Sequence, residues 1–164
     1  MEALEENEWF EFYRVMKAEI PVSLGTRSLV RLGRGGAFWA DSFRGFTTGF
    51  TFVTRYRFDE HRVSKSAPED WPDLTATTSI DASASVEVVI DGEHRSNLMH
   101  GVGHLHLVGA NSVPGIAMAE WWVPQLPRRA LSIVFRYEPF SDAARMDVSF
   151  DEWSAMIAGG IITL

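Results

Sequence analysis

The sequence predicts a mainly β protein, an antiparallel β-sandwich of about seven or eight strands with a short N-terminal helix and a C-terminal helix. Residues 49–58 place aromatic side chains at most alternate positions, which is the period of a half-buried strand. Asp91-Gly92 separates two further strand-like runs. That pair is typical of a two-residue hairpin turn, because both turn residues need a positive φ. A closed barrel is the alternative architecture.

A chain of 164 residues is expected to form one domain. We divide it into an acidic N-terminal helix or tail (1–19), a β-sandwich (20–140) and a C-terminal helical segment (141–164). A long polar loop is expected over 59–84, where no periodic pattern is found. The predicted strands are 28–32, 37–43, 49–58, 85–90, 93–98, 103–108, 117–123 and 130–137.

The first helix is predicted over residues 2–17, where Phe10, Tyr13, Met16 and Lys17 recur at helical spacing. The glutamate-rich start suits a helix N-terminus. The alternative is a frayed acidic tail that enters a strand near Phe10.

The second helix is expected after Ser149, because Ser149 and Glu152 have the spacing of a capping box. Trp153, Met156 and Ile157 form its apolar stripe. Gly159-Gly160 is expected to end it.

Composition excludes several classes of protein. The absence of cysteine rules out disulfides, thiol catalysis and cysteine-ligated zinc. A net charge of −7 argues against a general nucleic-acid binder. No apolar run approaches the length of a membrane span, and the acidic start lacks the features of a signal peptide. We therefore expect a soluble cytoplasmic protein without nucleic-acid or membrane partners.

Three histidines form the sharpest local motif. In one continuous strand, His100, His104 and His106 would point to the same face and could hold a divalent metal. His94 or Glu120 on a neighbouring strand could complete the site. The motif is superficially similar to the metal strand of the cupins, but the glutamate that follows in that pattern is absent. The alternative is a solvent-facing strand surface without metal.

Tryptophans are the second set of candidate binding residues. Trp121 and Trp122 are adjacent on a predicted strand, so one should lie in the core and the other should face outward. An outward indole can anchor a protein partner or stack on a sugar. Trp71 sits at the centre of the expected long loop and is a further candidate. The alternative is that the outward indole is covered by the C-terminal helix or a loop.

No sequence motif for catalysis is present. The glycines of 33–36 lack the lysine of a phosphate-binding loop, and there is neither a nucleophile elbow nor a zinc-protease motif. We therefore expect no catalytic residues and no organic cofactor.

Residues 20 to about 140 resemble a family of uncharacterised bacterial β-sandwich proteins. The matching points are Ile20-Pro21-Val22, Gly49-Phe50-Thr51-Phe52, and a tryptophan–proline turn at 122–127 followed by the strand 131–135. The family has no known activity, so the resemblance implies fold alone.

Three functions follow as hypotheses. The first is a non-catalytic protein-binding module of the bacterial cytoplasm, for example an immunity or inhibitor protein, that binds through Trp71, Trp121 or Trp122. The second is a metal-binding protein or metal-dependent enzyme using His100, His104 and His106. The third is a carbohydrate or small-ligand binder that uses an exposed tryptophan. A homodimer is compatible with each.

Overall fold

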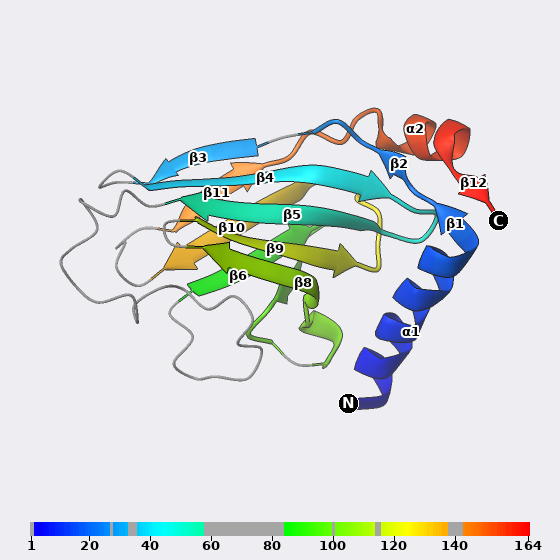
Figure 1. The fold of residues 1–164 in the computed structure, drawn as a ribbon, viewed down its shortest axis with the longest axis horizontal. Helices are drawn as coiled ribbons and strands as arrows, with labels where there is room; N and C mark the ends of the chain where they lie inside the picture. Colours follow the sequence, from blue (N-terminus) through cyan, green and yellow to red (C-terminus); the bar gives the residue numbers. More distant parts are fainter. Residues whose placement is uncertain are drawn as a thin grey trace.

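The protein consists of two large antiparallel β-sheets packed face to face, a small two-stranded sheet, and a helix near each end of the chain (Figure 1). A computed structural model provides the coordinates. It describes residues 2–26, 28–32, 36–57, 84–99, 101–113, 116–137 and 143–164. The predicted mainly β class and both helices are confirmed.

The larger sheet has six strands, of which two, β2 and β3, pair with successive parts of β4. Its long central strand is the one predicted from the alternation at 49–58. The strands are β2 (Val22–Ser23), β3 (Ser28–Leu32), β4 (Gly36–Gly45), β5 (Phe50–Arg57), β8 (His106–Val113) and β9 (Ile116–Val123).

The smaller sheet has four strands in the order β11-β10-β6-β7. The hairpin between β6 and β7 has positive φ at both Asp91 (53°) and Gly92 (93°), which confirms the turn predicted there. The strands are β6 (Ala84–Ile90), β7 (Glu93–Ser96), β10 (Leu131–Tyr137) and β11 (Ala144–Asp147).

The main hydrophobic core fills the space between the two sheets. Phe38 of the larger sheet stacks on Phe135 of the smaller one, with ring centroids 4.3 Å apart. Tyr56, Val88 and Ile133 are also fully buried there. Alternate residues of each strand face this layer, as the period of two requires.

Helix α2 (Trp153–Gly160) closes one end of the sandwich. Trp153 packs its indole 5.4 Å from Phe43 and 5.1 Å from Phe50, measured between ring centroids. Ile157 lies so close to Gly45 that a Cβ there would approach its Cγ1 to 2.6 Å. Glycine at position 45 therefore permits this helix to dock.

Helix α1 (Glu2–Ala18) lies outside the sandwich, against the larger sheet. It continues into β1 (Glu19–Ile20), which pairs with β12 (Ile162–Thr163) near the C-terminus. Figure 1 shows α1, β1 and β12 together at one end of the molecule. Among the described residues, no helix is long and apolar enough to cross a membrane.

Three details of the sequence prediction are wrong. The predicted strand 103–108 begins only at His106, because residues Gly101–Gly103 form a 3-10 helix. The C-terminal segment contains strand β11 before its helix. Glu152 is the N-cap of α2 and makes no side-chain capping bond, so the expected capping box is not formed. The expected loop 59–84 lies almost entirely outside the described residues.

Candidate functional site

The two adjacent tryptophans point to opposite faces of β9, as their strand parity predicts. Trp121 lies in the main core, and its indole N–H donates to the Thr54 hydroxyl at 2.8 Å. Trp122 lies on the outer face of the sheet, yet its exposed fraction is also 0%. Neither indole is therefore available as a surface anchor in this structure. Trp71 is outside the described residues.

The cover over Trp122 is α1, where the sequence suggested the C-terminal helix or a loop. Phe12 packs on Trp122 with ring centroids 5.2 Å apart, and Phe46 meets it edge-on at 5.6 Å. Val15 is fully buried and Trp9 partly buried in the same cluster. Burying such large side chains stabilises the docked helix.

An ion cluster lies beside this apolar contact and joins α1 to two strands. Glu8 of α1 accepts hydrogen bonds from both terminal nitrogens of Arg95 (3.1 and 3.2 Å). The same carboxylate is 2.9 Å from Nε2 of His106. Only 8% of the Arg95 side chain and 6% of the His106 side chain are exposed. A bidentate, largely buried pair of this kind fixes the orientation of the helix.

The surroundings of Glu8 favour its charged form. Burial raises the pKa of Glu8, but the hydrogen bonds from His106 and Arg95 outweigh burial and hold the pKa below its ordinary value. The carboxylate is therefore charged at neutral pH and neutralises the buried guanidinium. This arrangement is that of a structural clamp, in which the charges satisfy one another.

The predicted histidine cluster is only partly brought together. The rings of His104 and His106 are edge to face, with centroids 4.9 Å apart. Nδ1 of His104, however, is 2.7 Å from the Met99 carbonyl oxygen, and Nε2 of His106 is bonded to Glu8. His100 lies outside the described residues. The single continuous strand that the metal hypothesis assumed is interrupted by the 3-10 helix.

The two residues expected to complete a metal site have other partners. His94 is bonded through Nδ1 to Glu87, and Glu120 forms an ion pair with Arg44. Within the described part of the chain, no group of three or more histidine, aspartate or glutamate side chains is arranged to hold a metal ion. The described geometry therefore provides no ligand set for a metal.

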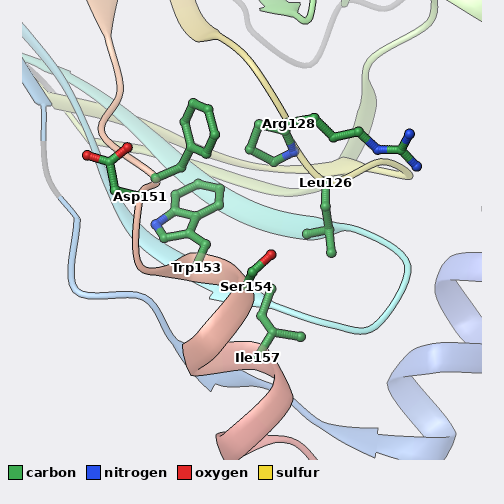
Figure 2. A pocket seen from close by; sticks show the side chains of 8 residues that line it. Leu126, Arg128, Asp151, Trp153, Ser154 and Ile157 are labelled. Atoms are coloured by element: carbon green, nitrogen blue, oxygen red, sulfur yellow. The ribbon is translucent and has the colours of Figure 1, made fainter.

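A pocket of about 390 Å³ opens between α2 and the turn at 124–130 (Figure 2). Its lining combines apolar side chains with a guanidinium, a carboxylate and a hydroxyl. The Asp91 carboxylate accepts the Arg128 backbone N–H at 3.0 Å and so fixes one wall. Its labelled lining residues are Leu126, Arg128, Asp151, Trp153, Ser154 and Ile157.

This pocket has a size suited to a small molecule, but its chemistry is not that of a catalytic centre. Ser154 has no imidazole among the lining residues that could act as its base. Asp151 and Arg128 project on different sides of the pocket in Figure 2, so they form no acid–base pair. It could offer a ligand both apolar contact, from side chains such as Trp153, and hydrogen bonds, from side chains such as Arg128 and Asp151.

Three large apolar side chains on the outer side of α1 are exposed. Phe10 is 67% exposed, Met16 49% and Tyr13 46%. Ile20 and Ile162 lie directly opposite each other in the β1–β12 pair, so their side chains share a face. We call the following set the α1 surface: Phe10, Tyr13, Met16, Ile20, Ile162 and Leu164.

A second exposed apolar group lies beside helix α1. Leu98, Met99 and Val102 lie in and beside the 3-10 helix, which contacts α1. Every exposed large apolar side chain among the described residues belongs to one of these two groups. Isolated exposed apolar residues are ordinary, whereas their concentration on one side of a protein marks an interaction surface.

Searches against known proteins found no family model, no curated protein and no solved structure that matches this chain. The resemblance to uncharacterised bacterial sandwich proteins therefore stays a prediction.

Sequence reasoning did not single out Glu8 or Arg95. The signal for Glu8 was present, because Glu8, Phe12 and Val15 recur at helical spacing and form a second face of the helix. Nothing in the sequence marked Arg95 as buried, because the sequence around a buried arginine on a short strand does not differ from that around a solvent-facing one.

Proposed function

We propose that this protein is a non-catalytic protein-binding module and that the α1 surface is where its partner docks. The single observation that carries the proposal is the concentration of exposed large apolar side chains on α1 and its neighbours. Exposed Phe10, at the centre of a solvated helix face, is costly unless another molecule covers it.

The way α1 is held supports this proposal. Its inner face is fixed by Phe12 and Val15 and by the bond from Glu8 to Arg95. A rigidly held helix presents its outer side chains in one geometry, so little conformational entropy is lost on binding. A row of apolar residues on such a helix matches the helix-in-groove and helix-packing modes of protein recognition.

The composition of the surface fits a protein partner better than a sugar. Carbohydrate sites usually need a flat aromatic ring flanked by hydrogen-bonding side chains, whereas four of the six members of the α1 surface have no side-chain hydrogen-bonding group and Met16 has only a weakly accepting sulfur. Tyr13 is the exception and offers one hydroxyl. Aromatic and methionine side chains are enriched at protein interfaces.

Site-specific photo-crosslinking in living cells tests the proposal. A photoreactive phenylalanine analogue is placed at Phe10 and, in a matched control, at Ala158, an exposed position of α2. We expect a discrete crosslinked product from position 10 and none from position 158. Equal, diffuse products from both positions, or no product from position 10, would contradict the proposal.

A further inference from the structure

We infer that the occupant of the α1 surface is a second copy of this chain, packed through an antiparallel pair of α1 helices related by a twofold axis at Tyr13. This inference rests on the proposed function, since it names the partner of that same surface. Three features of the described residues support it, namely the symmetry of the apolar row, the distribution of charge along α1, and the exposed area.

The apolar row is self-complementary. Phe10 and Met16 lie three residues before and three residues after Tyr13, about 4.5 Å along the helix axis on each side. An antiparallel partner centred at Tyr13 therefore places its Met16 against Phe10 and its Phe10 against Met16. Methionine–aromatic contacts of this kind are favourable. Twofold interfaces of this isologous type are the commonest in homo-oligomers.

The charge sequence of α1 selects the antiparallel direction. Residues 2–6 contain three glutamates and no base, whereas residues 14–17 contain Arg14, Lys17 and no acid. In an antiparallel pair, position 6 of one helix lies within about one turn, 5.4 Å along the axis, of Lys17 of the other. Glu19 of the other copy lies nearer along the axis, but its carboxylate accepts hydrogen bonds from the Thr47 backbone N–H and hydroxyl. A parallel pair would place glutamates beside glutamates and lysine beside lysine, which is repulsive.

The exposed area is close to what a stable dimer buries. With roughly 200 Å² for each large apolar side chain, the exposed fractions of the α1 surface correspond to on the order of 650 Å² per copy. A standard interface buries about 800 Å² per partner. The β1–β12 end extends the contact, because Ile162 (57% exposed) and Leu164 (77% exposed) continue the surface beyond the helix. In the antiparallel arrangement they lie over the first half of the partner's α1.

The absence of cysteine makes a sharp test available, because any introduced thiol is the only one in the chain. Three single variants are prepared in the full chain: Tyr13→Cys, Phe10→Cys and Met16→Cys, with Ala158→Cys as the exposed control. Thermal unfolding under reducing conditions checks that each is folded. Mild oxidation then follows at about 0.15 M salt, where the Debye length of about 8 Å limits long-range repulsion between copies.

We expect Tyr13→Cys to form a disulfide-linked dimer at least tenfold faster than Ala158→Cys. A mixture of Phe10→Cys and Met16→Cys should give more crosslinked dimer than either variant alone. Sedimentation of the unmodified protein should show dimers whose dissociation constant rises at least tenfold in Tyr13→Glu. Together these results identify both the partner and its direction.

Two results would overturn the inference. The first is crosslinking of Phe10→Cys with itself and of Met16→Cys with itself in preference to the mixture, which indicates a parallel pair. The second is a monomer at all concentrations with no crosslinking of Tyr13→Cys above the control. In that case, photo-crosslinking at Phe10 to a different protein would preserve the proposed function and reject only the second copy. No photo-crosslink at Phe10 would reject both.

Discussion

The two helices of this protein use their apolar rows in opposite ways. In α2, Trp153 and Ile157 turn inward and are 3% and 7% exposed. In α1, Phe10 and Tyr13 turn outward and are 67% and 46% exposed. Helical spacing reveals that an apolar row exists, but it does not say which way the row points. Helix α1 has a second apolar face, which includes Phe12 and Val15. Because that face is buried against the sheet, the row of Phe10 and Tyr13 remains exposed for a partner.

The buried face of α1 also differs in chemistry from the buried face of α2, which is apolar. The α1 face combines the aromatic ring of Phe12 with the charged group of Glu8, which is bonded to Arg95 and His106. A buried ion pair specifies orientation, because any other rotation of the helix leaves a buried guanidinium without its partner. We therefore expect the ion cluster, rather than apolar area alone, to decide which face of α1 is outward.

The largest expected effect is in α2. Trp153→Ala removes a buried indole from a cluster of aromatic rings and should lower the free energy of unfolding by about 3–5 kcal/mol. Phe10→Ala, an aromatic truncation on the outer side of α1 at a ring that is 67% exposed, should change it by less than about 0.5 kcal/mol. Urea denaturation of the two variants measures both. Equal losses of unfolding free energy in the two variants would contradict the conclusion that the α2 row is buried and the α1 row is exposed.

The second-largest expected effect is a difference in stability loss between substitutions of two glutamates of α1, Glu8 and Glu11. Glu8→Gln should lower the free energy of unfolding by about 2 kcal/mol, because hydrogen bonds to a charged, largely buried partner contribute about 1.5–3 kcal/mol. Glu11, which pairs with the exposed Arg14 at 2.8 Å, provides the control. Glu11→Gln should cost at most about 0.5 kcal/mol. The same denaturation series distinguishes them, and a smaller loss for Glu8→Gln than for Glu11→Gln would reject the clamp.

The pH dependence should follow Glu8. Its pKa lies below the ordinary value of 4.5 in the folded protein, so the stabilisation it provides is fully present above pH 4.5. That stabilisation is lost as the pH falls through the lowered folded pKa. The difference in urea midpoint between the wild-type protein and Glu8→Gln should therefore be constant from pH 7 to about 5 and shrink at lower pH. A difference in urea midpoint that grows as the pH falls would show that folding raises the pKa of Glu8 and would contradict the expected direction.

The smallest effect on stability should come from the α1 surface. Met16→Ser and Ile162→Ser should leave the free energy of unfolding within about 0.5 kcal/mol of the wild-type value. Both should nevertheless weaken association, because they remove apolar area from the proposed contact. Because association of the native protein itself raises its apparent stability, thermal unfolding is measured at a protein concentration below the dissociation constant of the dimer and sedimentation above it, so that the two properties are reported separately. Loss of stability with unchanged association would contradict the proposed role of this surface.

The sequence predicted the sandwich because its strongest patterns are local. The alternation along β5 and the turn at Asp91-Gly92 depend on neighbouring residues only, and both are confirmed. The opposite orientations of Trp121 and Trp122 also follow from strand parity alone. What covers Trp122 could not be predicted, because α1 comes from the other end of the chain and its docking is a non-local contact.

The histidine motif was difficult for a related reason. The period of two predicts a common face only if the strand is continuous, and a 3-10 helix at Gly101–Gly103 breaks the period before His106. The same limit applies to Glu8 and Arg95. Their sequence separation of 87 positions leaves no local trace of the pair. The row of Phe10, Tyr13 and Met16 could be recognised from its helical spacing, but its outward orientation depends on this contact and could be found only in the folded chain.

The central claim is that α1 is docked with Val15 inward and Phe10 outward, and thiol labelling tests it most directly. Val15→Cys and Phe10→Cys each introduce a single thiol, and both are treated with an excess of an aromatic disulfide reagent at low protein concentration. We predict that Phe10→Cys reacts at the rate of an unhindered thiol and that Val15→Cys reacts at least a hundredfold more slowly, through rare local opening of the helix. Equal rates, or faster reaction at position 15, would show that α1 does not hold this orientation and would remove the basis for the docking surface.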